Sequence, residues 1–416
     1  MPLTIPPSLR HSRFRLLWIG LLISVAGSRM QFWGLLWHIR TLSDQPIALG
    51  AIGLARILPV IFFSLIGGAL ADVVNRRRVL FFTQAVLILV ALSLGVLTLG
   101  GQITLWHIYT LTIIQAIAIS FDLPARQSLV PNLVSVHDLP NAFSMQSIAF
   151  TTGSIVGPAL SGLVIGYLGQ TQVYFINAAT YLAIIAALVL MGSVQQQSDP
   201  THPTRVDLPA VREGVHFIWK QPIILSSMLL DFFATFFSSA NALLPIFARD
   251  ILYVGAMEYG WLSAAQSIGA AIAAIVISQL KEIRRQGPVL LGSVVVFGLA
   301  TVGFGVSNSF LLTMLSLAVM GASDSVSVII RNTIRQLQTP DYLRGRMVSV
   351  NQIFFMGGPQ LGEVEAGLVA QFFGAPLAVI SGGVACILAV GWVTHRWPQL
   401  RHYNGDEPVL AGATTS

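Results

Sequence analysis

Long apolar runs alternate with short polar breaks along nearly the whole chain. Twelve of these runs have about the length at which an α-helix crosses the ~30 Å hydrocarbon core of a membrane. The first six cover residues 14–39, 47–71, 79–99, 103–122, 141–168 and 171–192. The second six cover 222–248, 256–280, 287–306, 308–330, 345–373 and 375–396. The pattern therefore predicts an all-α integral membrane protein with twelve transmembrane helices.

A polar, proline-bearing stretch divides these spans into two sets of six. We expect a cytoplasmic N-terminus at 1–13, a six-helix bundle at 14–192, a cytoplasmic linker at 193–221, a second bundle at 222–396 and a cytoplasmic tail at 397–416. The halves echo each other: Asp122 precedes Pro158 by 36 residues, and Asp324 precedes Pro359 by 35. This spacing predicts two pseudo-symmetric copies of one unit. Coincidence within glycine-rich helices remains the alternative.

Basic residues gather on one side of the expected membrane. With a cytoplasmic N-terminus, 19 of the 23 Lys and Arg residues fall in inside segments, among them Arg126, Arg331 and Arg335. Only Arg40 and Arg249 fall outside. The positive-inside rule then places both termini in the cytoplasm of a multi-pass protein. Because the basic residues are divided among short connections, no nucleic-acid partner is expected.

The composition argues against a soluble enzyme. Hydrophobic residues make up 54% of the chain and charged residues 10%, against ~25% in ordinary soluble domains. The single Cys386 and the scattered histidines offer no metal-ligand spacing, and no nucleophile with a matching base is apparent. We therefore predict no enzyme activity, no metal and no cofactor.

A charged turn follows the second expected span. Gly68 and Asp72 are followed by Asn75 and then by Arg76 and Arg77. So short a loop must turn sharply, and Asn75 tolerates a positive φ. The pattern resembles the loop 2/3 signature of the major facilitator superfamily, although Val73 and Asn75 replace a usual basic residue and a usual glycine. The resemblance implies a cytoplasmic latch between the halves; a plain topogenic charge cluster is the alternative.

The fifth expected span carries closely spaced glycines. Gly153, Gly157, Pro158 and Gly162 place small residues where a neighbouring helix can approach, and the proline removes one backbone hydrogen bond. The segment resembles the antiporter signature of the same superfamily, with Ser161 as its departure. That resemblance implies an exporter that exchanges substrate for protons, rather than an importer.

Further segments resemble a bacterial branch of the superfamily that includes the enterobactin exporter and macrolide-efflux-like permeases. They are Pro124 to Val134 and Thr339 to Arg346, with Gly357 to Gly362. The resemblance implies alternating access in a bacterial inner membrane, driven by the proton gradient, with small amphipathic molecules such as drugs or siderophores as cargo. We expect a functional monomer in the lipid bilayer. An uptake permease or a lipid transporter remains the alternative.

Four ionisable residues lie inside expected spans, where a charge costs ~2.5–3.5 kcal/mol and therefore needs a partner, water or a function. They are Arg29, Asp231, Glu363 and Glu365. The carboxylates are candidate proton carriers. The two glutamates point about 200° apart on a helix, so at most one faces a given cavity, and we favour Glu365. An Arg29–Asp231 ion pair that braces the halves, and a purely structural role for the glutamates, remain open.

Two further acids lie near cytoplasmic span ends. Asp122 is the last residue of the fourth expected span, and Asp324 lies near the cytoplasmic end of the tenth. Water is expected to reach both carboxylates there. We therefore predict gate or helix-end roles for both, rather than proton transport. Arg56, in the second span, is expected to extend toward the interface or to pair locally.

Overall fold

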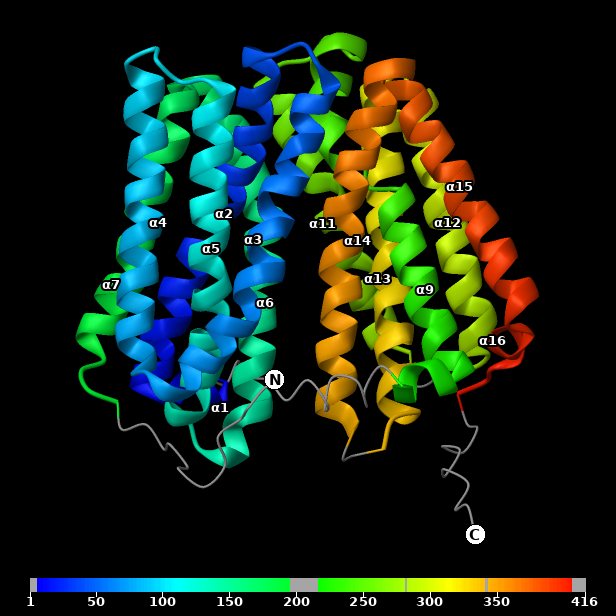
Figure 1. Ribbon diagram of the computed structural model, residues 1–416, viewed down its shortest axis with the longest axis horizontal. Coiled ribbons are helices and arrows are strands. Elements are labelled where there is room, and N and C mark those ends of the chain that lie inside the picture. Colours follow the sequence, from blue (N-terminus) through cyan, green and yellow to red (C-terminus); the bar gives the residue numbers. More distant parts are fainter. Residues whose placement is uncertain (1–5, 195–215, 281–282, 341–342, 406–416) are drawn as a thin grey trace. The chain divides into compact units, whose positions relative to one another are not determined.

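The computed structural model of the chain describes residues 6–194, 216–280, 283–340 and 343–405 (Figure 1). Within these ranges it leaves undescribed the side chains at 65, 68–69, 71–73, 240, 344–346, 348–350 and 352–356. Most of the expected linker 193–221, the start of the N-terminal segment 1–13 and the end of the tail 397–416 lie outside the described residues. The described segments form helices and contain no β-strand.

The described residues 6–194 form seven α-helices and two short 3-10 turns. Pro7–Arg10 (α1) leads into the long helix Ser12–Leu42 (α2), and α6 follows the turns Val130–Asn132 (η1) and Val136–Asp138 (η2). The remaining helices are Pro46–Val73 (α3), Arg76–Leu99 (α4), Leu105–Leu129 (α5), Leu139–Leu168 (α6) and Gln170–Leu190 (α7).

The second half begins with a broken helix. The expected span 222–248 agrees with a candidate membrane span at Pro222–Ile251, but its helix is interrupted. Pro222–Phe237 (α9) is followed by the turn Ala240–Leu243 (η3), the short Leu244–Ile246 (α10) and the π-helical Phe247–Ile251 (η4). Ser238, Ser239 and Asn241, which are weak helix formers, lie at this break, and Pro245 follows it and has no backbone N–H to donate. The others are Ala256–Ser278 (α11), Gln286–Val306 (α12), Phe310–Leu337 (α13), Arg344–Phe373 (α14), Ala375–Arg396 (α15) and Pro398–His402 (α16).

Eleven helical segments of the described chain are long and apolar enough to cross a membrane. They correspond to eleven of the twelve expected spans. The remaining expected span, 345–373, corresponds to α14, a 30-residue helix that carries Glu363 and Glu365 and is not among the eleven. The prediction of an all-α multi-pass membrane protein is thus confirmed.

Two helices run further than the sequence pattern predicts. The expected ends at 122 and 330 are extended to Leu129 in α5 and Leu337 in α13. Arg126, Arg331 and Arg335 therefore lie on helices, and each is less than 9% exposed, rather than in polar connections. Their burial is explained by carboxylate partners nearby.

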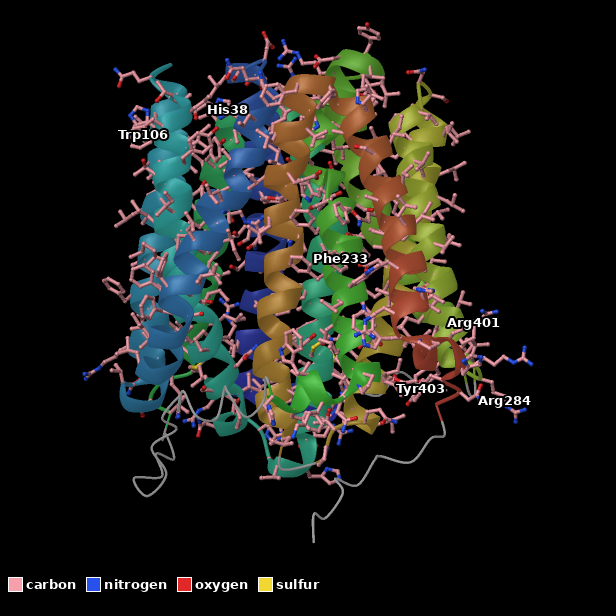
Figure 2. The ribbon with its side chains drawn as sticks, turned by 45° about the vertical axis from the view of Figure 1, so that its right-hand side comes forward. His38, Trp106, Phe233, Arg284, Arg401 and Tyr403 are labelled. Atoms are coloured by element: carbon pink, nitrogen blue, oxygen red, sulfur yellow. The ribbon has the colours of Figure 1, made fainter. Side chains whose placement is uncertain are left out.

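The chain divides into two compact units. Unit 1 comprises residues 1–44, 54–205 and 254–264, and unit 2 comprises 45–53, 206–253 and 265–416. Unit 1 has a core that runs from Phe14 on α2 through Leu80 on α4 to Leu188 on α7. His38 and Trp106 lie toward one end of unit 1, and Arg401 and Tyr403 lie at one end of unit 2 (Figure 2).

Candidate functional site

The connection between α3 and α4 is closed by a helix cap. The Asn75 side chain accepts hydrogen bonds from the backbone N–H groups of Arg77 at 3.1 Å and Arg78 at 3.4 Å. Asn75 has a φ of −57° and so does not adopt the positive φ that asparagine tolerates. The residue serves as N-cap, which satisfies N–H groups that a helix start leaves open. Gly68 and the side chain of Asp72 lie outside the described residues.

The arginines of this connection have different partners. Arg77 donates from Nε to the carbonyl oxygen of Leu188 at 2.8 Å, and its guanidinium lies 5.2 Å from the Phe81 ring centroid. Both contacts are inside unit 1. Arg76 is half-buried at the first position of α4.

The glycines of the fifth span make close helix contacts within unit 1. A Cβ added at Gly153 would meet Val25 of α2 at 2.5 Å, and one at Gly157 would meet the Arg29 Cβ at 2.4 Å. A Cβ at Gly162 would instead meet the carbonyl oxygen of Ala256 on α11 at 2.6 Å. Pro158 lies inside α6, between these contacts. The glycines thus allow α6 to pack closely against α2 and α11, and the Cβ of Arg29 lies directly against Gly157.

Arg29 is exposed although it lies in the middle of a 31-residue helix. It shows no hydrogen bond or ion pair among the described residues. Arg56, on α3, lies close enough to Arg29 for repulsion between the two charges, and its guanidinium is 4.5 Å from the Phe32 ring centroid. Two cations and an aromatic ring therefore lie close together in unit 1.

Amide and aromatic side chains of unit 1 form two further sets of hydrogen bonds to α2. Asn177 donates to Gln31 at 2.7 Å, and Gln31 donates to Gln115 at 3.2 Å. Tyr259 donates to the Trp33 carbonyl oxygen at 2.9 Å. These bonds satisfy polar groups inside apolar helices and fix α2 against α5, α7 and α11.

Asp231 forms the centre of a buried charge cluster in unit 2. Its Oδ1 lies 2.7 Å from Arg331 and its Oδ2 lies 3.5 Å from Arg335. Arg331 also lies 3.6 Å from Asp324. Asp231 and Arg331 are each 2% exposed. The cluster joins α9 to α13. Asp231, for which an ion pair with Arg29 was left open as an alternative, is bound by two arginines of its own unit.

Asp122 forms a second cluster, in unit 1. Its carboxylate accepts from Thr83 at 2.9 Å and from Gln84 at 2.7 Å, and it pairs with Arg126 one turn further along α5. Asp122 is 6% exposed, so the expectation that water reaches it is wrong. Asp324, by contrast, has a side chain that is 38% exposed. Asp122 is more buried than Asp324 because Thr83 and Gln84 of α4 pack against its carboxylate. The sequence does not show which helix packs beside Asp122, so this burial was not predicted.

The two glutamates of α14 have different surroundings. Glu363 is 5% exposed, and its carboxylate lies over Gly53 of α3, where an added Cβ would approach Oε2 to 3.1 Å. Glu365 is half-buried, and it shows no hydrogen bond or ion pair among the described residues. The expectation that the two point to different surroundings agrees with this geometry.

Sequence reasoning missed Arg331 and Arg335 as site residues. A usable signal was present: Arg126 follows Asp122 by four residues, and Arg331 follows Asp324 by seven, which places each pair on one helix face. In the described part of the chain, no group of His, Cys, Asp and Glu could hold a metal ion.

Long apolar helices, buried intramembrane charges and close glycine contacts between helices are typical of multi-pass membrane transporters. The family model described as "Transmembrane secretion effector" matches residues 4–408, and the chain belongs to that family.

Named relatives are transporters, not enzymes. The multidrug efflux pump Tap of Mycolicibacterium fortuitum is 26% identical, over 89% of this chain and 90% of that protein. The enterobactin exporter EntS of Citrobacter koseri is 27% identical, over 84% and 83%. A solved bacterial homologue of the human lysosomal transporter Spinster has a TM-score of 0.72 at 14% identity, over 96% and 97% of the two chains. That last likeness concerns the fold alone.

Proposed function

We propose that this transporter is a proton-coupled exporter of small amphipathic molecules such as drugs or siderophores. It would work by alternating access, as a monomer in a bacterial inner membrane, with bundles 14–192 and 222–396 and both termini in the cytoplasm. The direction of transport is supported by the family and by relatives named as an efflux pump and an exporter.

The observation that carries proton coupling is the isolation of Glu365. It is half-buried on a 30-residue helix and has no hydrogen bond or ion pair in the described part of the chain. A carboxylate at bilayer depth without a cation is costly, and binding a proton removes its charge. Asp231, held by Arg331 and Arg335, is stabilised as an anion. We therefore assign proton binding to Glu365.

The other charged groups receive different roles under this proposal. The exposed Arg29, seated over Gly157 in unit 1, is the candidate for contact with cargo. Asp231 and its arginines hold α9 and α13 together. Asp122 and Asp324 keep gate or helix-end roles, and the turn around Asp72 remains the proposed cytoplasmic latch.

The proton gradient supplies enough free energy for this cycle. One proton that moves down 100 mV releases ~2.3 kcal/mol, which supports a concentration ratio of about 50 for a neutral cargo exchanged one for one. A pH difference of one unit without a voltage supports a ratio of about ten.

The experiment is cargo movement in proteoliposomes that contain the full chain, with a panel of fluorescent amphiphiles and siderophores. With the voltage held at zero, we expect an imposed pH difference of one unit to drive uphill movement of at least one compound toward a ratio of about ten. Empty liposomes under the same gradient are the control. Movement that is equal with and without the gradient would contradict antiport and favour facilitated uptake or lipid transport.

A further inference from the structure

A cavity of about 450 Å³ lies in unit 1, between the end of α3, the first half of α4 and the middle of α5. Ligand pockets commonly have volumes of ~300–1,000 Å³. Its lining is apolar except for Arg78 and Thr83, and it includes Leu70, Val74, Phe82, Val86, Ile114 and Phe121. The cavity therefore suits an alkyl chain.

The walls of this cavity reach the outer surface of the unit. Phe82 is 72% exposed, Ile114 is 39% exposed and Leu70 is 38% exposed. These residues belong to helices that cross the membrane, so an apolar surface of this kind contacts lipid rather than water. An acyl chain can enter from the bilayer without crossing a polar barrier.

Arg78 is the only cation in the lining, and its side chain is exposed. Its guanidinium has no hydrogen bond or ion pair in the described part of the chain. The neighbouring Arg77, in contrast, donates to the Leu188 carbonyl oxygen and lies against Phe81. Arg78 also lies in the first turn of α4, where the helix dipole adds positive potential. One charge at the rim of the cavity is thus available to an anion.

We propose that this cavity binds one acyl chain of an anionic phospholipid, whose phosphate is bound by Arg78. The apolar walls match the chain, and the arginine at the helix start matches a head group at the membrane boundary. A zwitterionic lipid fits the same walls but gains less from the arginine, because its head group carries no net charge.

The bound lipid would bear directly on the Asp122 cluster. Thr83 lines the cavity, and its hydroxyl donates to Asp122 Oδ1 at 2.9 Å. Asp122 in turn pairs with Arg126. An acyl chain in the cavity would hold Thr83 in place and so support the contact between α4 and α5. Anionic lipid is therefore expected to stabilise unit 1.

The test is a lipid titration of the purified full chain in detergent, followed by native mass spectrometry. Phosphatidylglycerol and phosphatidylcholine with identical acyl chains are compared. We expect phosphatidylglycerol to bind more tightly, and R78Q to weaken its binding about fivefold with little effect on phosphatidylcholine. V86F, which adds a ring to the cavity, is expected to weaken both lipids.

R401Q is the matched control, because Arg401 is an exposed arginine of α16 in unit 2 and its loss also removes one positive charge (Figure 2). It should leave the preference for phosphatidylglycerol unchanged. Equal losses in R78Q and R401Q would overturn the proposal, because they would indicate general charge attraction. Displacement of phosphatidylglycerol by inorganic phosphate at equal concentration would also overturn the proposal, because it would show that the acyl chain adds nothing to binding. A V86F variant that blocks an amphiphilic cargo but still binds both lipids would overturn it as well.

Discussion

The two buried acid–arginine clusters differ in how they are built. In unit 1, Asp122 pairs with Arg126 on its own helix and takes neutral donors from α4. In unit 2, Asp231 on α9 is bound by Arg331 and Arg335 on α13. The second cluster therefore depends on one carboxylate that is shared by two cations from another helix. Burial alone does not identify a proton carrier; the number of cations around the carboxylate separates these clusters from Glu365.

The largest effect is expected from D231A. The substitution leaves Arg331 and Arg335 buried, at 2% and 4% exposure, without their main counter-ion. Removing one partner of a buried ion pair typically costs ~3–5 kcal/mol. We expect a large fall in the melting temperature in detergent. D44A is the control, because the Asp44 side chain is 88% exposed and pairs with one arginine, Arg40, of its own helix end rather than with two on another helix. An unchanged melting temperature for D231A would show that the cluster does not hold α9 to α13.

D122A should cost less. It leaves one buried arginine, Arg126, rather than two, and it removes hydrogen bonds from the neutral Thr83 and Gln84. We expect a loss at the lower end of that range, about 3 kcal/mol, measured by the same thermal denaturation. A loss equal to or greater than that of D231A would break the distinction between the two clusters.

G157A should have the smallest of these effects. Its added Cβ would meet the Arg29 Cβ at 2.4 Å and the Ala26 carbonyl oxygen at 2.8 Å, so α2 and α6 must separate. Overpacking of this kind costs ~1–3 kcal/mol, partly offset by the ~1 kcal/mol that alanine gains over glycine in a helix.

G292A is the matched control for this substitution, because nothing lies within 4 Å of a Cβ at Gly292 of α12. It should be neutral or slightly stabilising in the same thermal measurement. If G157A changed the melting temperature no more than G292A does, the close packing of Arg29 against Gly157 of α6 would be refuted.

The sequence was sufficient for the spans but not for the partners of the buried charges. Apolar runs predict membrane helices because the hydrocarbon core sets their length, and eleven of twelve expected spans agree with the structure. The span that begins at residue 222 was predicted as unbroken because serine and asparagine in a short apolar stretch are weak signals of a break. Arg331 was assigned to a connection because a charge after an apolar run usually marks its end.

The candidate site was predicted in part. Asp231 and Glu365 were identified as unusual because charge at bilayer depth is costly. Their surroundings depend on which helices pack together, and no local pattern reports this. The partners of Asp231 lie 100 and 104 residues further along the chain. The cavity beside Arg78 likewise arises from three helices and was not predictable from any one of them.

The most direct test of the account compares two activities of E365Q in proteoliposomes: uphill movement driven by a pH gradient, and exchange of labelled for unlabelled cargo without a gradient. We predict that E365Q loses the gradient-driven ratio, from about ten to about one at one pH unit, and retains exchange. D44N, at an exposed carboxylate, should retain both. Gradient-driven movement that persists in E365Q would contradict the assignment of proton binding to Glu365.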